Sequence, residues 1–454
     1  MLTQEDLRVR TVGPPRFPSP LGLSTTPDDH IPDYVLDSAR VALAVETDHE
    51  GPLETLYFEK AGPRERIALD PTTVRAGIVT CGGLCPGLNH VVRSLVFELH
   101  HKYRVRDILG YRYGYAGLGP GREPPLDLGP SIVRHIHRLG GSLLGLSRGH
   151  QQPSVMLETL ARDGVNVLFT IGGDGTLRGA HALALEAERQ GQALSVVGVP
   201  KTIDNDVPWV DKTFGFDTAV ELACVAVDGA HTEALSALRG VGIVKLMGRD
   251  AGFITAAAAI ASGEANFCLV PEVPFDLEGP HGLLAAVEAR LRTHSHALLV
   301  VAEGCAARVF DASRGALDAS GNVRYASDTL DIGPYLRERL QRHLQDVGLN
   351  PTIKYIDPSY MIRSVPANAS DGIFCDALAR NAVHAAMAGR TDVVVGRWHR
   401  VFTHLPLTVA TATRKSLDPD GALWLAVTEM TGQPPLVPRH PGWRRSTRPA
   451  AGPR

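Results

Sequence analysis

No run of apolar residues in this sequence approaches the roughly 18 residues that a membrane-spanning helix requires. The first ten residues, MLTQEDLRVR, are polar and lack the apolar core of a signal peptide. There is no excess of basic charge either, because 46 lysines and arginines face 49 acidic residues and leave a formal net charge of −3. A general electrostatic attraction to nucleic acid is therefore not expected. We expect a cytoplasmic protein with neither a membrane nor a nucleic-acid partner.

Cysteine is scarce, with six residues scattered over a chain of 454. A cytoplasmic chain with so few thiols is not expected to carry a disulfide framework. Cys81 and Cys85 lie four positions apart, but no second Cys or His pair lies nearby to complete a tetrahedral metal site. We therefore do not expect a zinc centre at this pair.

What the sequence does contain is a regular alternation of elements. From residue 74 onward, short apolar segments alternate with helix-like ones, a pattern typical of a mainly parallel sheet with helices on both faces. The length suits two α/β lobes of ordinary size. Strands are expected at 74–80, 105–109, 165–171, 194–199, 241–246, 267–270, 297–302 and 393–395. Helices are expected at 177–189, 283–292 and 331–347, the last followed by a turn-rich stretch at 350–358. The predicted fold is α/β, with two Rossmann-like lobes and the active site between them, since such sheets bind ligands at the carboxyl ends of their strands.

Two glycine-rich turns directly follow expected strands: CGGLCPGLN at 81–89 and IGGDGT at 171–176. Glycine lets backbone N–H groups turn inward and cradle a phosphate, and the start of the next helix attracts anions. Asp174, within the second turn, is a hard oxygen ligand suited to Mg²⁺. The alternatives are a tight strand–helix turn for the first motif and a helix cap for the second. A cap suits Thr176 better than Asp174, for a helix beginning near residue 177. The second motif also occurs in NAD kinases and diacylglycerol kinases, so alone it indicates a phosphate donor and no particular substrate.

A third motif, PKTIDND at 200–206, places Asp204 and Asp206 two residues apart. In extended backbone both carboxylates would point the same way, which is unfavourable unless a metal or a proton relay uses them. The functional interpretation makes Asp204 a general base and lets Asp206 help to place a metal or its water shell. The alternative is a polar turn.

Cations recur where strands are expected to end or loops to begin. Arg148 follows a Gly-Gly turn, Arg249 closes KLMGR, and Arg363 closes YMIR, which Lys354 precedes. Such a cluster of positive charge could hold phosphorylated ligands, although any one of these arginines could equally be a solvated surface group.

Taken together and in this order, the motifs resemble the phosphofructokinase family over roughly residues 74–400. The segments VTCGGLCPGLN, IGGDGT, PKTIDND, KTFGFDTAVE, VKLMGRDAGFI and YIDPSYMIR are most similar to the plant-type ATP-dependent branch, which is related to pyrophosphate-dependent enzymes. The resemblance implies a kinase that phosphorylates fructose 6-phosphate to fructose 1,6-bisphosphate with ATP and Mg²⁺, as a homodimer or homotetramer. A pyrophosphate-dependent enzyme is the alternative.

The resemblance also implies roles for individual residues. It assigns the nucleotide phosphates to Gly82, Arg148, Gly172, Gly173, Asp174 and Gly175, and Mg²⁺ to Asp174. It assigns catalysis to Asp204 as base, with Thr202 and Arg249. It assigns the sugar phosphate to Thr202, Ile203, Asp204, Met247, Gly248, Arg249, Glu303, Tyr360 and Arg363, with Lys354 as a helper from a neighbouring subunit.

The same resemblance predicts five parts of the chain. Residues 1–73 form an extension packed on the main body. Residues 74–216, completed by 360–400, form a nucleotide-binding lobe, and 217–359 form a sugar-phosphate-binding lobe. Residues 401–433 are a C-terminal segment, and 434–454, with six prolines and five arginines, are expected to be disordered.

Donor choice is expected to depend on Gly175 and Lys201. Pyrophosphate users of the family carry aspartate at the position of Gly175, where a carboxylate would repel and displace the α-phosphate of ATP. Lys201 stands where the better-known bacterial ATP enzymes have glycine, and it favours pyrophosphate. Because plant-type ATP enzymes combine this lysine with the glycine, Gly175 decides for ATP. Those bacterial enzymes also have histidine at the position of Tyr360 and arginine at the position of Gly240. We therefore do not expect this chain to share their effector pocket.

Overall fold

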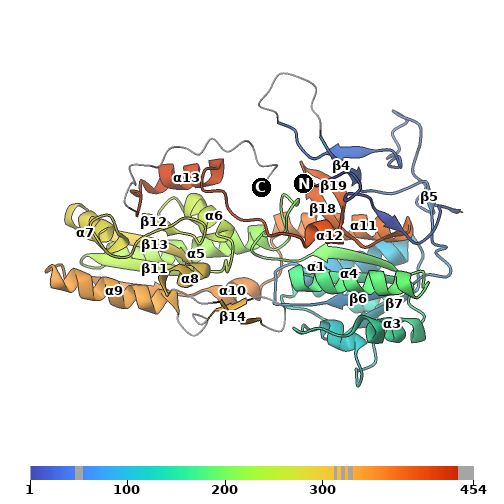
Figure 1. The fold of residues 1–454 in the computed structure, drawn as a ribbon, viewed down its shortest axis with the longest axis horizontal. Coiled ribbons are helices and arrows are strands. Elements are labelled where there is room, and N and C mark those ends of the chain that lie inside the picture. Colours follow the sequence, from blue (N-terminus) through green and yellow to red (C-terminus); the bar gives the residue numbers. More distant parts are fainter. Residues whose placement is uncertain (1, 47–54, 311–313, 318–322, 326–330, 438–454) are drawn as a thin grey trace.

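The computed structural model describes the chain except residues 1, 47–54, 311–313, 318–322, 326–330 and 438–454. The described part forms two α/β halves that lie end to end (Figure 1). The larger half contains a nine-stranded sheet in the order β3-β4-β19-β18-β10-β9-β6-β7-β8, and the smaller half a four-stranded sheet in the order β12-β13-β11-β16. Two short N-terminal pairs, β1-β17 and β2-β5, and the hairpin β14-β15 lie outside these sheets.

The strands of the large sheet are β3 (Arg40–Ala42), β4 (Tyr57–Lys60), β6 (Arg75–Thr80), β7 (Asp107–Tyr111), β8 (Leu126–Asp127), β9 (Val167–Gly172), β10 (Ser195–Pro200), β18 (Val393–Trp398) and β19 (Val401–Pro406). Those of the small sheet are β11 (Gly240–Leu246), β12 (Phe267–Leu269), β13 (His296–Ala302) and β16 (Thr352–Ile356). The remaining short strands are β1 (Arg10–Thr11), β2 (Phe17–Pro18), β5 (Arg66–Ile67), β14 (Arg314–Leu317), β15 (Val323–Tyr325) and β17 (Arg390–Thr391).

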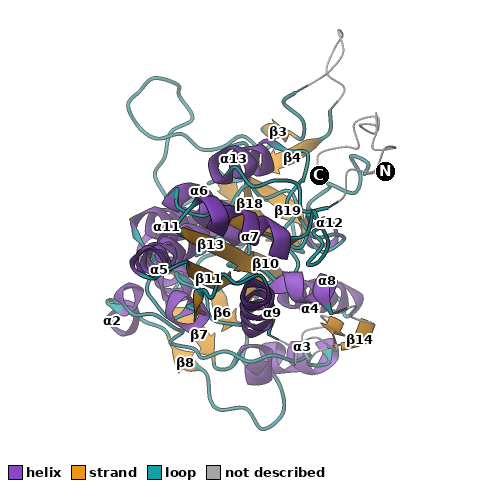
Figure 2. Cartoon of the chain, turned by 90° about the vertical axis from the view of Figure 1, so that its left-hand side faces the viewer, coloured by secondary structure: helices purple, strands orange, loops and turns teal. Residues whose placement is uncertain are grey.

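The helices are α1 (Leu88–Phe97), α2 (Pro130–Val133), α3 (Pro153–Arg162), α4 (Asp174–Arg189), α5 (Phe216–Ser236), α6 (Phe253–Ser262), α7 (Leu283–Thr293), α8 (Ala306–Val309), α9 (Ile332–Asp346), α10 (Ser359–Arg363), α11 (Ala369–Met387), α12 (Leu407–Ala410) and α13 (Ala422–Thr431). Helices cover both faces of the strands, as the view along the long axis makes clear (Figure 2).

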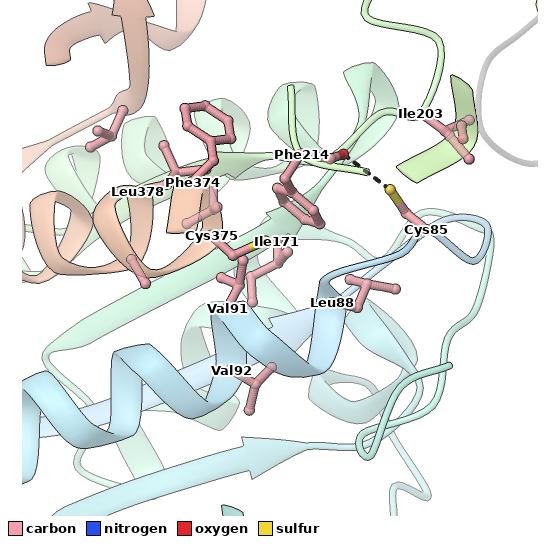
Figure 3. Packing of buried hydrophobic residues seen from close by; sticks show 14 of the residues in the cluster. Cys85, Leu88, Val91, Val92, Ile171, Ile203, Phe214, Phe374, Cys375 and Leu378 are labelled. Atoms are coloured by element: carbon pink, nitrogen blue, oxygen red, sulfur yellow. Dashed lines mark hydrogen bonds between the residues drawn. The ribbon is translucent and has the colours of Figure 1, made fainter. Parts of the chain in front are cut away.

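The alternation of side chains along β9 explains this layering. Phe169 and Ile171 point to the cluster formed with α1 and α11, whereas Leu168, which precedes Phe169, points to the cluster formed with α3 and α4. A strand buried on both faces reads as a continuous apolar run, which is why it was visible in the sequence. Figure 3 shows the first of these clusters, in which Cys85 and Phe214 pack near Cys375 of α11.

The parallel core follows the sequence-based expectation. Strands β18, β10, β9, β6 and β7 are mutually parallel, and so are all four strands of the small sheet. A strand occurs at each of the eight expected positions. The turn-rich stretch expected at 350–358 is wrong, because β16 lies there and pairs with β11. Its flanking prolines suggested turns, yet they lie outside the paired residues and leave the strand's hydrogen bonds intact.

The N-terminal extension contributes strands to the large sheet. β4 pairs with β19 and β3 pairs with β4, both antiparallel, so residues 40–42 and 57–60 widen the sheet at one edge. At the other end of the chain, the described part stops at residue 437, so most of the expected disordered tail lies outside it. Leu436 is buried, and its carbonyl accepts a hydrogen bond from the Asp276 amide. Within the described residues, no helix is both long enough and apolar enough to cross a membrane.

Candidate active site

One polar cleft collects the loops at the carboxyl ends of strands from both sheets. β6, β9 and β10 contribute the three glycine- and aspartate-containing motifs, and β11 and β13 contribute the residues that follow them on the other side. The expected site residues that line it are Gly82, Arg148, Gly173, Asp174, Gly175, Lys201, Thr202, Ile203, Asp204, Arg249, Glu303 and Arg363. Parallel strands place their carboxyl ends at one edge, and this geometry brings motifs that lie far apart in the sequence into contact.

The first glycine turn lies against Lys201. Gly82 adopts φ of 86°, a left-handed conformation that favours glycine, and an added Cβ there would lie 3.2 Å from Lys201 Nζ. Lys201 Nζ donates a hydrogen bond of 2.8 Å to the Gly83 carbonyl oxygen. Burial lowers the pKa of Lys201, although neighbouring thiols and Asp204 oppose this effect. Lys201 therefore holds the first glycine turn in place, and it also lines the cleft.

The second glycine turn leads directly into α4. An added Cβ on Gly172 would lie 2.2 Å from Thr176 Oγ1, so the close packing of this turn requires glycine. The helix begins at Asp174 and its N-cap is Gly173, whose side chain cannot cap, so the expected cap at Thr176 and start near 177 are wrong. Because Gly173 allows the chain to enter the helix earlier, Asp174 occupies the first turn. There its carboxylate is favoured by the helix dipole and remains free of a capping role.

Asp174 is held by cations from two different segments. Its Oδ2 lies 2.8 Å from Arg178 Nη1, one turn further along α4, and 3.3 Å from Arg414 Nη2. Arg414 also forms a short ion pair with Asp250, which follows β11. Asp250 and Arg414 line the cleft and were both missed by the sequence reasoning. Asp250 could have been found, since it follows Arg249 directly, whereas Arg414 lies outside every motif.

The third motif forms a turn, so the expected extended backbone is wrong. A turn occupies Ile203 and Asp204, and Asn205 adopts φ of 57°. Asp206 therefore does not lie parallel to Asp204, and its Oδ1 instead accepts a hydrogen bond of 2.7 Å from Thr202 Oγ1. Polar side chains that hydrogen-bond the local backbone favour such turns over strands.

The surroundings of Asp204 oppose its ionisation. Its Oδ1 is buried and has no hydrogen-bond partner among the described residues. Burial raises the pKa of Asp204 well above its usual range, and the negative charges of Asp206 and Glu303 raise it further, while Arg363 opposes them. An unpaired buried oxygen at the floor of a polar cleft can accept a proton or a hydrogen bond from a ligand.

The remaining expected residues from β11 and α10 form the opposite wall. Met247 is fully buried, and its sulfur accepts a contact of 2.9 Å from Arg363 Nε, which orients the guanidinium. Gly248 adopts φ of 126°, and an added Cβ would lie 2.4 Å from the Ala251 carbonyl oxygen, so this turn also requires glycine. Glu303 lines the cleft, and burial raises its pKa.

Four expected residues lie outside the cleft lining besides Met247, namely Gly172, Gly248, Tyr360 and Lys354. Gly172 and Gly248 shape the turns on which the lining residues lie. Tyr360 is 85% exposed on α10, and Lys354 is exposed on the edge strand β16, so neither reaches the cleft of this chain. The lining also includes Gly83, Leu84, Tyr115, Ser147 and His150, which the sequence reasoning did not single out.

The residues present fit Mg²⁺ better than a metal with a complete protein cage. In the described part of the chain, no three His, Cys, Asp or Glu side chains are arranged to hold a metal ion. Cys81 and Cys85 are buried thiols whose pKa values burial raises, which disfavours the thiolate form that a zinc ligand needs. Mg²⁺ needs only one or two carboxylates when phosphate oxygens complete its shell, and Asp174 and the unpartnered Asp204 offer these.

Comparisons with known proteins agree with this geometry. Residues 75–386 match the family model described as phosphofructokinase. The chain is 49% identical over 442 residues to the ATP-dependent 6-phosphofructokinase of Amycolatopsis methanolica, covering 95% of each chain. It is 44% identical to the chloroplastic ATP-dependent 6-phosphofructokinase 5 of Arabidopsis thaliana, covering 86% of this chain and 72% of the relative.

Solved structures share the fold at lower identity. The pyrophosphate-dependent phosphofructokinase from Marinobacter aquaeolei matches with a TM-score of 0.63 and 21% identity, covering 76% of this chain and 86% of that one. The Pichia pastoris phosphofructokinase matches with a TM-score of 0.60 and 22% identity, covering 79% of this chain and 37% of that one. The family match and the extent of the sequence identity lead to one conclusion: this chain belongs to the phosphofructokinase family.

Proposed function

We propose that this protein is an ATP-dependent 6-phosphofructokinase, which transfers the γ-phosphoryl group of ATP to the 1-hydroxyl of fructose 6-phosphate. The observation that carries the proposal is the unpartnered, buried Asp204 at the centre of one cleft between two glycine turns and an arginine-bearing wall. Relatives that are 49% and 44% identical are named ATP-dependent 6-phosphofructokinases.

In this mechanism the protein positions the two substrates and neutralises charge, because phosphoryl transfer needs little covalent help. The turns at Gly82 and at Gly172–Gly175 hold the phosphates of ATP with Arg148. Mg²⁺, held by Asp174 with Asp204 or Asp206 nearby, supplies charge neutralisation on the phosphates. Thr202 orients the 1-hydroxyl, and Asp204 accepts its proton as the new bond forms.

The sugar phosphate occupies the opposite wall. Glu303 and Ile203 contact the sugar, Met247 and Gly248 shape its pocket, Arg249 lies near the transferred group, and Arg363 binds the 6-phosphate. An arginine–phosphate contact is charge-assisted and commonly bidentate, so it holds the far end of the sugar in a fixed orientation.

We propose that the protein works as a homodimer or homotetramer. Tyr360 and Met361 are 85% and 73% exposed on α10, directly beside Arg363. Two large apolar side chains next to a binding residue are typical of a surface that another subunit covers. In such an assembly Tyr360 and Lys354 could serve the 6-phosphate site of the adjacent subunit. We place the enzyme in the cytoplasm, although the Arabidopsis relative is named chloroplastic.

ATP is the proposed donor because Gly175 is the second residue of α4, facing the cleft. A carboxylate there would repel the α-phosphate of ATP, whereas pyrophosphate ends one phosphate earlier. Pyrophosphate remains the second candidate on one observation, since Lys201 Nζ lies beside the first glycine turn and suits a compact, highly charged donor.

A coupled assay with fructose 6-phosphate and either donor tests the proposal. We expect turnover with ATP and Mg²⁺, and we expect Gly175→Asp to lower kcat/KM for ATP at least tenfold, or about 1.4 kcal/mol. Gly229→Asp is the matched control, because Gly229 lies in α5 with open space around it and far from the cleft lining. Turnover with pyrophosphate and none with ATP would overturn the donor assignment.

A further inference from the structure

Arg414 contacts residues on both sides of the cleft. It lies in a segment that contains none of the sequence motifs described above. It follows α12, and its guanidinium pairs with Asp174 at the start of α4 and with Asp250 after β11. Asp174 follows a strand of the large sheet, and Asp250 follows a strand of the small sheet. A single cation therefore spans the place where the two substrates must meet.

The backbone around Arg414 is anchored to the catalytic loops. The Lys415 amide donates a hydrogen bond of 2.9 Å to the carbonyl oxygen of Asp206, in the motif that carries Asp204. Lys415 Nζ donates 2.8 Å to the Val210 carbonyl oxygen, further along the same loop. The segment is thus held in place by main-chain contacts, and the arginine side chain projects from a fixed base.

The next residues anchor the segment to the other half of the cleft. The Leu417 amide donates a hydrogen bond of 2.8 Å to Glu272 Oε1, and the Gly252 amide donates to the same carboxylate at 2.9 Å. Gly252 lies two residues after Asp250, in the loop that also carries Arg249. Leu417 itself is 1% exposed, so its side chain adds an apolar anchor. Arg414 is therefore placed with respect to both Asp204 and Arg249.

The ion pairs of Arg414 also indicate what happens when ligands arrive. Asp174 Oδ2 is shared by Arg178 at 2.8 Å and Arg414 at 3.3 Å. If Asp174 turns to Mg²⁺, the longer contact is the weaker one and is lost first. The guanidinium of Arg414 lines the same cleft as the phosphate-binding turns, where a phosphate oxygen is a strong acceptor for arginine N–H groups.

We propose that Arg414 is a further catalytic residue, which binds the phosphoryl group during its transfer. This inference rests on the proposed function. In the step, the bond from the γ-phosphorus to the β–γ bridging oxygen breaks and a bond to the sugar O1 forms. The O1 proton goes to Asp204, and ADP leaves with the electron pair of the broken bond. Arg414 donates N–H groups to non-bridging oxygens of the moving group, where charge must be neutralised, and undergoes no covalent change.

The test compares Arg414→Met and Arg414→Lys with Arg178→Met. Arg178 is the matched control because it pairs with the same Asp174 oxygen, yet it is 41% exposed and does not line the cleft. We expect Arg414→Met to lower kcat at least 100-fold while KM for fructose 6-phosphate changes less than threefold. Arg414→Lys should lose at least tenfold, because lysine keeps the charge and not the planar fork. Arg178→Met should lose less than fivefold.

The difference in kcat between Arg414→Met and Arg178→Met distinguishes direct contact with the phosphoryl group from an indirect effect through Asp174. If Arg414 acts only through Asp174, both methionine variants should raise the Mg²⁺ concentration needed for half-maximal rate and lower kcat equally, which would overturn the proposal. A kcat within threefold of wild type in Arg414→Met would overturn it as well. If Arg414→Met does not fold, as judged by circular dichroism and thermal melting, Arg414→Lys alone decides. A kcat at least tenfold below wild type then supports the proposal, and a kcat within threefold of wild type overturns it.

The wild-type rate in the same assay tests the proposed function by itself. If the wild type does not turn over fructose 6-phosphate with ATP, the proposed function fails and Arg414 is judged by calorimetric binding of Mg²⁺·ATP. Weakening of at least tenfold in Arg414→Met, with less than threefold in Arg178→Met, supports the contact with phosphate. Equal affinities in the two variants overturn it.

Discussion

At the scale of single residues, the site depends on Asp204, whose ionised form is disfavoured by its surroundings. Asp204 lies buried beside the carboxylates of Asp206 and Glu303, and its Oδ1 has no partner among the described residues. Its pKa is raised, so ionising it at neutral pH lowers the stability of the folded protein. A residue that opposes folding in this way is characteristic of a functional position rather than a structural one.

Asp204→Asn should therefore lower activity and raise stability together. We expect kcat to fall by roughly 10²–10⁴, the usual contribution of a positioned base. Thermal unfolding at pH 7 should show a gain of at least about 1 kcal/mol, close to the value of one pKa unit. Since the folded pKa lies above the ordinary value of 3.8, the wild type should lose stability as pH rises above about 4, and the variant should lose less.

The control for this pair of effects is Asp228→Asn on the exposed face of α5, which should change neither quantity beyond about 0.5 kcal/mol. A variant of Asp204 with near-normal kcat would show that this residue is not the base.

Arg363→Ala should act mainly on binding of the sugar phosphate. The guanidinium is oriented by Met247 and lines the cleft. A contact with the 6-phosphate lies far from the reacting hydroxyl, so it is present in the ground state and the transition state alike. We expect KM for fructose 6-phosphate to rise at least tenfold in steady-state kinetics. A rise in KM for ATP with no change for the sugar would contradict this assignment.

At the scale of elements, the edge of the large sheet is joined by one buried carboxylate. Glu59 of β4 lies 2.8 Å from Arg390 Nε, 3.2 Å from Arg64 Nη2 and 3.0 Å from His404 Nδ1 of β19. Burial alone would raise the pKa of Glu59, but His404 and Arg390 lower it well below its usual range. These contacts fasten the N-terminal strands to the C-terminal ones.

Glu59→Gln should destabilise the fold by about 1–3 kcal/mol, because it leaves the buried Arg64 and the partly buried Arg390 with only the exposed Asp37 as counter-charge. Chemical denaturation measures the loss. Glu338→Gln is the control, since Glu338 pairs with Arg342 where both are more than 60% exposed, and such pairs contribute about 0–1 kcal/mol.

The lowered pKa of Glu59 also predicts how the stability of the fold depends on pH. The folded pKa of Glu59 is depressed, so its stabilisation is complete above the ordinary value of 4.5 and is lost as pH falls toward the folded value. Unfolding of the wild type should thus become easier below about pH 4.5, and the variant should show a flatter profile there. Parallel profiles would mean that Glu59 is not the group responsible.

At the scale of the whole molecule, the two halves share one core, and two large side chains of α10 are left exposed. The cluster that includes α1 and α11 also includes Val244 and Leu246 of β11, so packing is continuous between the halves. Tyr360 and Met361 remain exposed at α10, which lies between the two halves in Figure 1. We infer that a second copy of the chain covers this surface.

Met361→Asp should accordingly dissociate the assembly and raise KM for fructose 6-phosphate, because a charge in a desolvated interface is unfavourable. Sedimentation velocity and steady-state kinetics measure the two effects. Leu238→Asp is the control, since Leu238 is 80% exposed just before the amino end of β11, at the opposite end of that strand from the site. An assembly that survives Met361→Asp unchanged would place the interface elsewhere.

The parallel strands and the turns that follow them could be predicted from the order of the residues. Strands such as β9 are buried on both faces and therefore appear as continuous apolar runs, and turns such as those at Gly172 and Gly248 admit no side chain. Several strands at or near sheet edges escaped prediction, although the edge strand β12 was expected: β16 is short and lies between prolines, and β3 and β4 gain their place only by pairing with one another and with β19. Sheet edges are specified by partners rather than by local pattern.

The arrangement of charges in the site depends on the fold. The pKa of Asp204 is raised because folding buries the residue and brings the carboxylates of Asp206 and Glu303 beside it, and Arg414 reaches Asp174 across 240 positions of sequence. Electrostatic interactions depend on the distance between charges and on their burial. When the partners lie on different elements, their separation along the sequence indicates neither quantity. Spacing could therefore identify the phosphate-binding turns, whereas the arginine that joins the two sides of the cleft became visible only once the chain had folded.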